Sequence, residues 1–143
     1  MAIKQISLFI ENKTGRLQKA LRILKENQIN IRALSLADST KFGILRLILD
    51  QPGKAKEVLE ENNFIVKSID IIAIEVDDNP GGLDTALEIL GQHDINVEYV
   101  YAFVEKKTEK ALVVIKTDDC NTTTQVLREN NISVLESSDI TNL

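Results

Sequence analysis

The sequence is poor in cysteine and histidine, with one residue of each, and it has no tryptophan. A single cysteine, Cys120, allows no intrachain disulfide and no thiolate metal cluster. No apolar run approaches the ~20 residues that a membrane-spanning helix needs, and residues 1–10 alternate polar and apolar side chains without a signal-peptide core. We therefore expect a cytoplasmic protein that carries no metal and no other cofactor.

Aromatic residues and positive charge are also scarce. Aromatic side chains make up 4% of the chain, and 17 basic residues stand against 22 acidic ones, for a net charge of -5. Nucleic-acid binding needs clustered Lys and Arg, and RNA-recognition modules stack bases on aromatic side chains of a sheet. Nucleic acid is therefore not an expected partner. The 43% of apolar residues is instead ordinary for a soluble globular protein.

One short stretch of the sequence occurs twice. Residues 12–17 are Asn-Lys-Thr-Gly-Arg-Leu, and residues 78–83 are Asp-Asn-Pro-Gly-Gly-Leu. At an offset of 66, nine of the 26 positions in residues 6–31 are identical to their counterparts, and the offset later drifts to 68. Such a repeat predicts duplication of one fold, with the small drift placed in loops. We predict a first unit at residues 1–70 and a second unit at residues 71–143.

Hydrophobic periodicity predicts the same order of elements in both units. Strand patterns alternate with helix patterns, in which apolar residues recur every three or four positions. The predicted strands are residues 3–10, 29–37, 42–49 and 64–69, then 71–76, 95–103, 110–116 and 132–136; the predicted helices are 15–27, 54–62, 81–92 and 122–130; hairpin turns are predicted at 38–41 and 105–108. The order predicts an α+β protein with two tandem ferredoxin-like βαββαβ units, each a four-stranded antiparallel sheet with both helices on one face.

A sheet covered by helices on one side leaves its other face bare. We expect apolar residues on that face to be covered by the other unit or by a second chain, which predicts a homo-oligomer such as a dimer. The residues that we expect to need this cover are Leu45, Leu47, Leu49, Val114 and Lys116. Tyr99 and Tyr101 alternate on one strand, and we expect both in a core or an interface.

Each repeated turn ends a strand and opens a helix on a glycine. The first N–H groups of a helix have no partner within the helix, so each turn directs a row of donors at one place. The sequence therefore predicts two anion-binding turns. Their edges differ, since Lys13 and Arg16 make the first basic whereas Asp77 and Asp78 make the second acidic. We expect unequal affinities for this reason.

Two motifs occur together in each unit. The glycine turn is followed, after its helix, by Ile-Asn-Ile at residues 29–31 and by Ile-Asn-Val at residues 95–97. Together with the βαββαβ order, this resembles the ACT domain over the whole chain, as two tandem copies. The resemblance implies a non-catalytic regulatory module that binds an amino-acid effector and signals to a partner in amino-acid metabolism. Thr14 departs from the family pattern, which usually has proline there.

The resemblance also implies where the effector binds. In the family, ligands commonly lie between two ACT units, against the turn after the first strand and the start of the second strand. The positions implicated are Asn12, Thr14, Gly15, Arg16, Leu17 and Asn30 in the first unit, and Asp78, Asn79, Gly81, Gly82, Leu83 and Asn96 in the second. An amino acid suits such a site, because its carboxylate accepts from helix-start amides and its ammonium needs carboxylate or carbonyl acceptors.

Structural roles are the alternative for the same residues. The glycines can serve only to make a tight turn, and Asn30 and Asn96 can bond to local backbone groups. Among functions, the alternatives are a small ferredoxin-like enzyme, with Arg16 as its only candidate at a glycine turn, and an RNA-binding module of the same topology. No nucleophile and base can be paired from the sequence, so we expect no catalytic residues.

Overall fold

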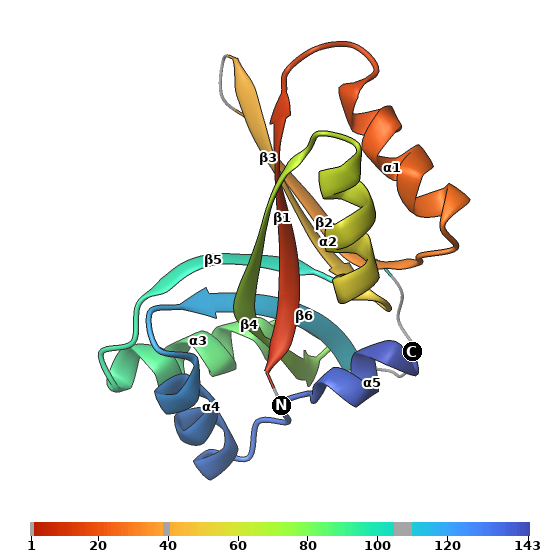
Figure 1. Ribbon diagram of the computed structural model, residues 1–143. Coiled ribbons are helices and arrows are strands. Elements are labelled where there is room, and N and C mark those ends of the chain that lie inside the picture. The colour runs from red at the N-terminus through yellow and green to blue at the C-terminus, as the bar shows by residue number, and fades with distance from the viewer. Residues whose placement is uncertain (1, 39–40, 105–109) are drawn as a thin grey trace.

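The computed structural model describes residues 2–38, 41–104 and 110–143. It confirms the predicted α+β class and the tandem ferredoxin-like arrangement, with all strands antiparallel to their neighbours. Of the two predicted hairpin turns, Ser39, Thr40 and residues 105–108 lie outside the described residues. Figure 1 shows the first unit above the second, with β4 reaching from one to the other.

The first unit follows the predicted order of elements. Its elements are β1 (Ile3–Glu11), α1 (Arg16–Glu26), β2 (Ile31–Asp38), β3 (Phe42–Leu49), α2 (Pro52–Glu61) and the first part of β4 (Ile65–Asp77). Helix α1 buries Ala20, Ile23 and Leu24, a stripe with the three-to-four spacing of a helix that covers a sheet. The strands lie in the order β2-β3-β1-β4, so the chain returns beside its own first strand.

The second unit repeats this order. Its elements are the rest of β4, α3 (Gly82–Gln92), β5 (Val97–Ala102), β6 (Lys110–Thr117), α4 (Cys120–Glu129) and α5 (Ser137–Thr141). The predicted last strand, residues 132–136, is reduced to a single bridge between Ile74 and Val134. The short helix α5, which we did not predict, follows and buries Ile140.

Strand β4 belongs to both units. The sequence predicts two strands, at residues 64–69 and 71–76, but the structure joins them into one strand of 13 residues. Residues Ile65 to Ile71 pair with β1, and residues Ile72 to Asp77 pair with β6. The result is a single six-stranded sheet in the order β2-β3-β1-β4-β6-β5, and the predicted boundary at residue 70 falls inside β4.

The buried apolar residues in the described part of the chain form three cores. One lies between the helices and the sheet of each unit, and the third lies between the two units. The expectation for Leu45, Leu47 and Leu49 was wrong, because all three are buried in the core under α1 and α2. The helix-free face carries the alternate residues of β3 instead, and of these Ile48 is in the core between the units together with Val114.

A buried polar network also joins the units. Gln5, which is fully buried, donates from Nε2 to the hydroxyls of Tyr99 (2.8 Å) and Ser7 (2.9 Å), and its Oε1 accepts from the Tyr101 hydroxyl at 2.6 Å. The guanidinium of Arg46 lies 3.8 Å from the centre of the Tyr99 ring. Burial raises the pKa of Tyr101, so its hydroxyl remains a donor at neutral pH. The two tyrosines therefore lie in an interface, as predicted.

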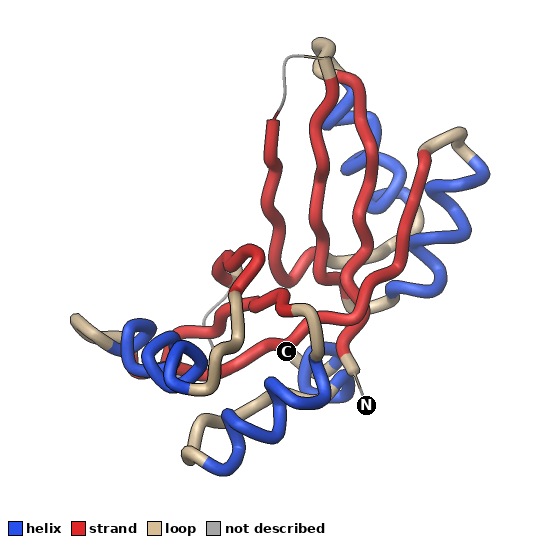
Figure 2. Tube along the Cα trace, turned by 90° about the vertical axis from the view of Figure 1, so that its left-hand side faces the viewer, coloured by secondary structure: helices blue, strands red, loops and turns tan. Residues whose placement is uncertain are grey.

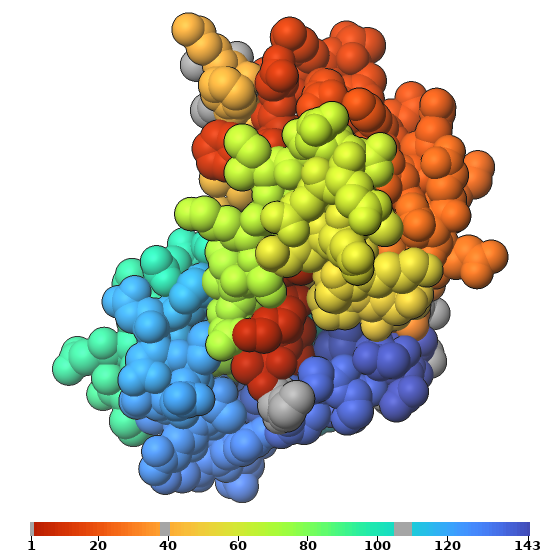
Figure 3. Space-filling model, viewed as in Figure 1, coloured from red at the N-terminus to blue at the C-terminus, as the bar shows by residue number. Residues whose placement is uncertain are grey.

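The end of the chain closes the same interface. Ile140 on α5 is buried in the core between the units, and Arg32 Nη2 donates to the Thr141 carbonyl at 3.3 Å. The edges of the sheet also meet here, since Ala33 on β2 bridges Phe103 just beyond β5. Figure 3 shows the blue C-terminal residues packed beside the red N-terminal ones and below the yellow residues of α2. The units are therefore held together at several places besides β4.

Candidate functional site

Both repeated turns open their helices on a left-handed glycine. Gly15 is the N-cap of α1 with a φ of 87°, and Gly81 is the N-cap of α3 with a φ of 90°. Residues with a Cβ rarely adopt this conformation, which explains why the sequence keeps glycine at both positions. In this respect the two turns are nearly identical.

The glycine caps leave backbone donors available at each helix start. Gly82 N–H donates back to the Asn79 carbonyl at 3.1 Å, and Thr85 N–H donates to the Gly81 carbonyl at 3.0 Å. The N–H groups of Leu83 and Asp84 lie between these two bonds, and a glycine cap has no side chain with which to accept from them. The N–H groups of Leu17 and Gln18 have the same place in α1. Such N–H pairs suit a carboxylate.

A pocket of about 360 Å³ lies beside the second turn. Its walls are the end of β4, the first turn of α3 and residues 131–133. Three of the lining residues are acidic, Glu75, Asp77 and Asp84, whereas Lys110 is basic and lies 3.6 Å from the Asp77 carboxylate. The volume falls in the range of small-molecule sites, about 300–1,000 Å³. The lining offers both backbone donors and carboxylate acceptors.

Gly82 allows the chain to pass close to itself at this pocket. A Cβ at this position would lie 1.9 Å from the Asp77 carbonyl oxygen, so the carbonyl occupies the space of a side chain. Its counterpart in the first turn is Arg16, which does carry a side chain. The two turns therefore differ in shape despite their similar glycine caps.

The first turn has much less room. The cavity beside it measures about 70 Å³ and is lined in part by Leu17, Leu36 and Asn12. Glu11 and Lys13 form an ion pair at 3.0 Å across its edge, and the hydrogen bond and charge of Lys13 lower the pKa of Glu11. The Arg16 guanidinium lies 4.9 Å from the centre of the buried Phe64 ring, so its side chain packs on the first core.

The strand-start asparagines lie far from the turns of their own units. Asn30 precedes β2 and lies beside Asp50, whose carboxylate accepts from the Asn30 N–H at 2.9 Å, whereas the first turn lies beside Lys41 at the other end of the sheet. A strand of eight residues spans about 26 Å. The Asn30 side chain accepts from the Ile31 N–H at 2.9 Å, which is the local bonding of the structural alternative.

Asn96 has the equivalent place in the second unit. The adjoining Val97 pairs with Thr117, at the end of β6 remote from Lys110, whereas Lys110 pairs with Asp77 next to the second turn. The structure thus brings together Asn79, Gly81 and Gly82 around the pocket at the second turn. Neither asparagine that starts a strand reaches the turn of its own unit.

Another cavity, of about 470 Å³, lies between α4 and the start of β1. The sequence gives no sign of this cavity, because it forms between segments from opposite ends of the chain. Residues 134–136 and the start of β1, at Ala2 and Ile3, lie along the same edge of β4. Cys120 lines it, and burial raises the pKa of this thiol. In residues 2–38, 41–104 and 110–143, no three His, Cys, Asp or Glu side chains are grouped to hold a metal ion.

The glycine turns, the βαββαβ order and its repetition define a pair of ACT domains. A family model described as "ACT domain pair" matches residues 1–143, and the chain belongs to this family. No match was found among curated proteins. Within the described part of the chain, no helix is long and apolar enough to span a membrane.

Solved structures share the fold of most or all of this chain. Protein BT0572 from Bacteroides thetaiotaomicron is 36% identical, with a TM-score of 0.93 over 100% of this chain and 98% of that one. The regulatory subunit of aspartate kinase from Thermus thermophilus has a TM-score of 0.62 at 15% identity, over 90% of this chain and 93% of that one. Aspartokinase III from E. coli, in complex with lysine and aspartate, has a TM-score of 0.54 at 16% identity, over 90% of this chain and 31% of that one.

Proposed function

We propose that this protein is a non-catalytic regulatory module that binds a free amino acid at its glycine turns and passes the signal to a partner in amino-acid metabolism. The observation that carries the proposal is the pocket at the second turn, where backbone donors of a helix start meet carboxylate acceptors. Membership of the ACT domain pair family supports it. So does the shared fold with an aspartokinase that has been crystallised with two amino acids.

The proposed binding residues are those named from the sequence, and they form two sites that differ in expected affinity. Asp78, Asn79, Gly81, Gly82 and Leu83 form the second turn, which we propose as the stronger site. Because the first cavity is about 70 Å³ against about 360 Å³, we propose that Asn12, Thr14, Gly15, Arg16 and Leu17 form a weaker one. Asn30 and Asn96 contribute only where another unit approaches, as in a homo-oligomer. We also propose residues 1–70 and 71–143 as the two ACT domains.

Titration calorimetry of the full chain against each of the twenty amino acids tests this function. We expect at least one of them to bind with a dissociation constant between about 1 µM and 1 mM, because a few charge-assisted hydrogen bonds less the cost of binding give that range. One strong site and a second, at least tenfold weaker, are expected. Heat from none of the twenty at millimolar concentration would remove the ligand proposal.

A reciprocal exchange between the two helices locates the strong site. Thr85 lines the second pocket, and its counterpart in α1 is Lys19. Thr85→Lys places a long side chain at the pocket, and we expect the affinity of the strong site to fall at least tenfold. The matched control, Lys19→Thr, should leave that affinity unchanged. An equal effect of both substitutions would show that the strong site is not at the second turn.

A further inference from the structure

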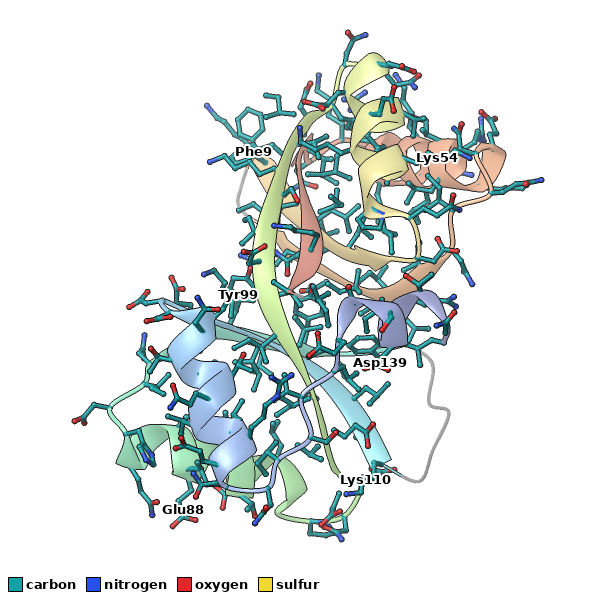
Figure 4. The ribbon with its side chains drawn as sticks, turned by 60° about the horizontal axis from the view of Figure 1, so that its bottom comes forward. Phe9, Lys54, Glu88, Tyr99, Lys110 and Asp139 are labelled. Carbon is teal, nitrogen blue, oxygen red and sulfur yellow. The ribbon has the colours of Figure 1, made fainter. Side chains whose placement is uncertain are left out.

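Among the described residues of the first unit, three large apolar side chains are exposed on the helix-free face of the sheet. Phe9 is 51% exposed, Phe42 46% and Ile65 68%. They are neighbours, because Phe9 pairs with Ile65 in the strand register and the rings of Phe9 and Phe42 lie 5.9 Å apart. We call these three residues the distal patch. Figure 4 shows Phe9 at the end of the first unit that lies away from the second.

The fold itself does not require apolar residues at these positions. The second unit has the same register, in which Asp77 pairs with Lys110 as Glu11 pairs with Phe42. Its residue equivalent to Phe42 is therefore Lys110. By the same register the equivalents of Phe9 and Ile65 are Glu75 and Ser133, which are joined by a backbone hydrogen bond. The second unit thus folds with polar side chains where the first has the distal patch.

The distal patch continues a surface that is already an interface. The near half of the same face contributes Ile3, Ile48 and Ile71 to the core between the units. Figure 2 shows the strands of the first unit standing upright over the second unit, so that only the base of this face is covered. The upper half has the same apolar character and is still exposed. An equivalent contact from a second molecule would complete the cover.

Two opposite charges flank the distal patch, Lys67 and Glu11, and Glu11 is also paired with Lys13 of its own chain at 3.0 Å. Lys67 and Glu11 are exposed and lie on the helix-free face on opposite sides of Phe9, because Lys67 pairs with Ser7 and Glu11 lies two residues beyond Phe9. If a second copy packs on this face with its strands reversed, a two-fold axis near Phe9 places Lys67 of each copy over Glu11 of the other. The distal patches of the two copies then meet in the centre of the contact.

We propose that the distal patch is the contact surface between two copies of this chain, which pack face to face with their strands antiparallel. The proposal specifies the assembly part of the proposed function. The outer half of a four-stranded sheet offers an area of only a few hundred Å², so we expect a reversible dimer with a dissociation constant on the order of 10–100 µM rather than an obligate one.

Sedimentation velocity of the full chain, from about 1 µM to about 500 µM, tests the proposal. The average mass of the wild type should rise from monomer to dimer. The variant that combines Phe9→Glu, Phe42→Lys and Ile65→Ser introduces the residues of the second unit, and its association should weaken at least tenfold. Val104→Ser is the matched control, because Val104 is 65% exposed but lies outside the distal patch. It should associate like the wild type.

A charge exchange tests the antiparallel arrangement. Lys67→Glu and Glu11→Lys should each weaken association about threefold to tenfold, and the double variant should recover most of the loss.

A wild type that remains monomeric at 500 µM overturns the proposal, and so does a folded triple variant that still dimerises. Should the triple variant lose its native circular dichroism, Ile65→Ser alone decides, because this exposed side chain contributes little to folding.

The amino-acid titration is repeated at a few micromolar, where the chain is monomeric. If an amino acid binds at this concentration but the chain stays monomeric up to 500 µM in sedimentation, the proposed function stands and this inference is removed. Dimerisation without binding does the reverse.

Discussion

Replacing Gly82 with alanine is expected to lower the free energy of unfolding by about 3 kcal/mol and to remove the pocket at the second turn. The added Cβ would lie 1.9 Å from the Asp77 carbonyl oxygen and 2.9 Å from its carbon. A backbone carbonyl cannot swing away as the end of a side chain can, so the turn must open. Overpacking of this kind costs about 1–3 kcal/mol, and displacement of the carbonyl adds to it. Urea denaturation measures the loss of stability, and calorimetry measures the loss of ligand binding.

Two other glycines of the second unit serve as controls. Gly91→Ala meets nothing within 4 Å and lies within α3, so stability should stay the same or rise slightly. Gly81→Ala also has open space, but its φ of 90° costs about 1–2 kcal/mol. We therefore expect Gly91→Ala to be the most stable of the three variants, Gly81→Ala the next and Gly82→Ala the least stable. If Gly82→Ala were as stable as Gly91→Ala, the Asp77 carbonyl oxygen could not lie as close to residue 82 as the structure places it.

Replacing Gln5 with leucine is expected to destabilise the protein by about 3 kcal/mol. Leucine has a similar size but offers neither donor nor acceptor to Tyr99 and Tyr101 at the interface between the units. A buried polar group left without its partner costs about 1–3 kcal/mol, and the Tyr101 hydroxyl loses its acceptor outright. Thermal and urea denaturation measure the change. Gln18→Leu, on the exposed side of α1, is the control and should change stability by less than 0.5 kcal/mol, as is usual for surface sites.

A double-mutant cycle separates the hydrogen bonds from the packing. Tyr101→Phe removes one bond and should cost about 1 kcal/mol. In the Gln5→Leu background the same substitution should cost nothing or should stabilise, because the hydroxyl then has no acceptor to lose. If the two costs simply add, the Gln5–Tyr101 bond does not hold the units together.

Much of the fold follows from the sequence because its signals are local and occur twice. The apolar spacing in residues 15–27 predicts α1, and repetition of the glycine turn predicts α3 at the matching place. A repeated glycine also has a local cause, since a φ near 90° excludes most other residues at the helix start. The predicted fold class, tandem repeat and family are confirmed.

The misses share one physical reason, which is contact between residues far apart in the chain. Nothing local in residues 65–77 shows that one strand pairs with β1 at its start and with β6 at its end. Period-two alternation shows which residues share a face but not which face the helices cover, so Leu45, Leu47 and Leu49 were assigned to the wrong side. Buried Gln5 was missed because two of its partners, Tyr99 and Tyr101, lie more than 90 residues away.

The candidate site was predictable only as two turns. That the second turn has a pocket of about 360 Å³ depends on residues 131–133, which come from the far end of the unit. The place of Arg16 against Phe64 likewise depends on packing between distant elements. The sequence showed that the edges of the two turns differ in charge, but their difference in volume became visible only in three dimensions.

The shared strand β4 determines how this molecule can respond mechanically. Twisting one ACT domain against the other would shear two hydrogen-bonded ladders at the point where they meet, next to Ile71 and Ile72. A flexible tether would let two domains turn freely, whereas here one continuous strand is hydrogen-bonded into both units. Under the proposed function, a bound amino acid would therefore act on a partner through the outer surfaces of the pair, with little change in the angle between the two units.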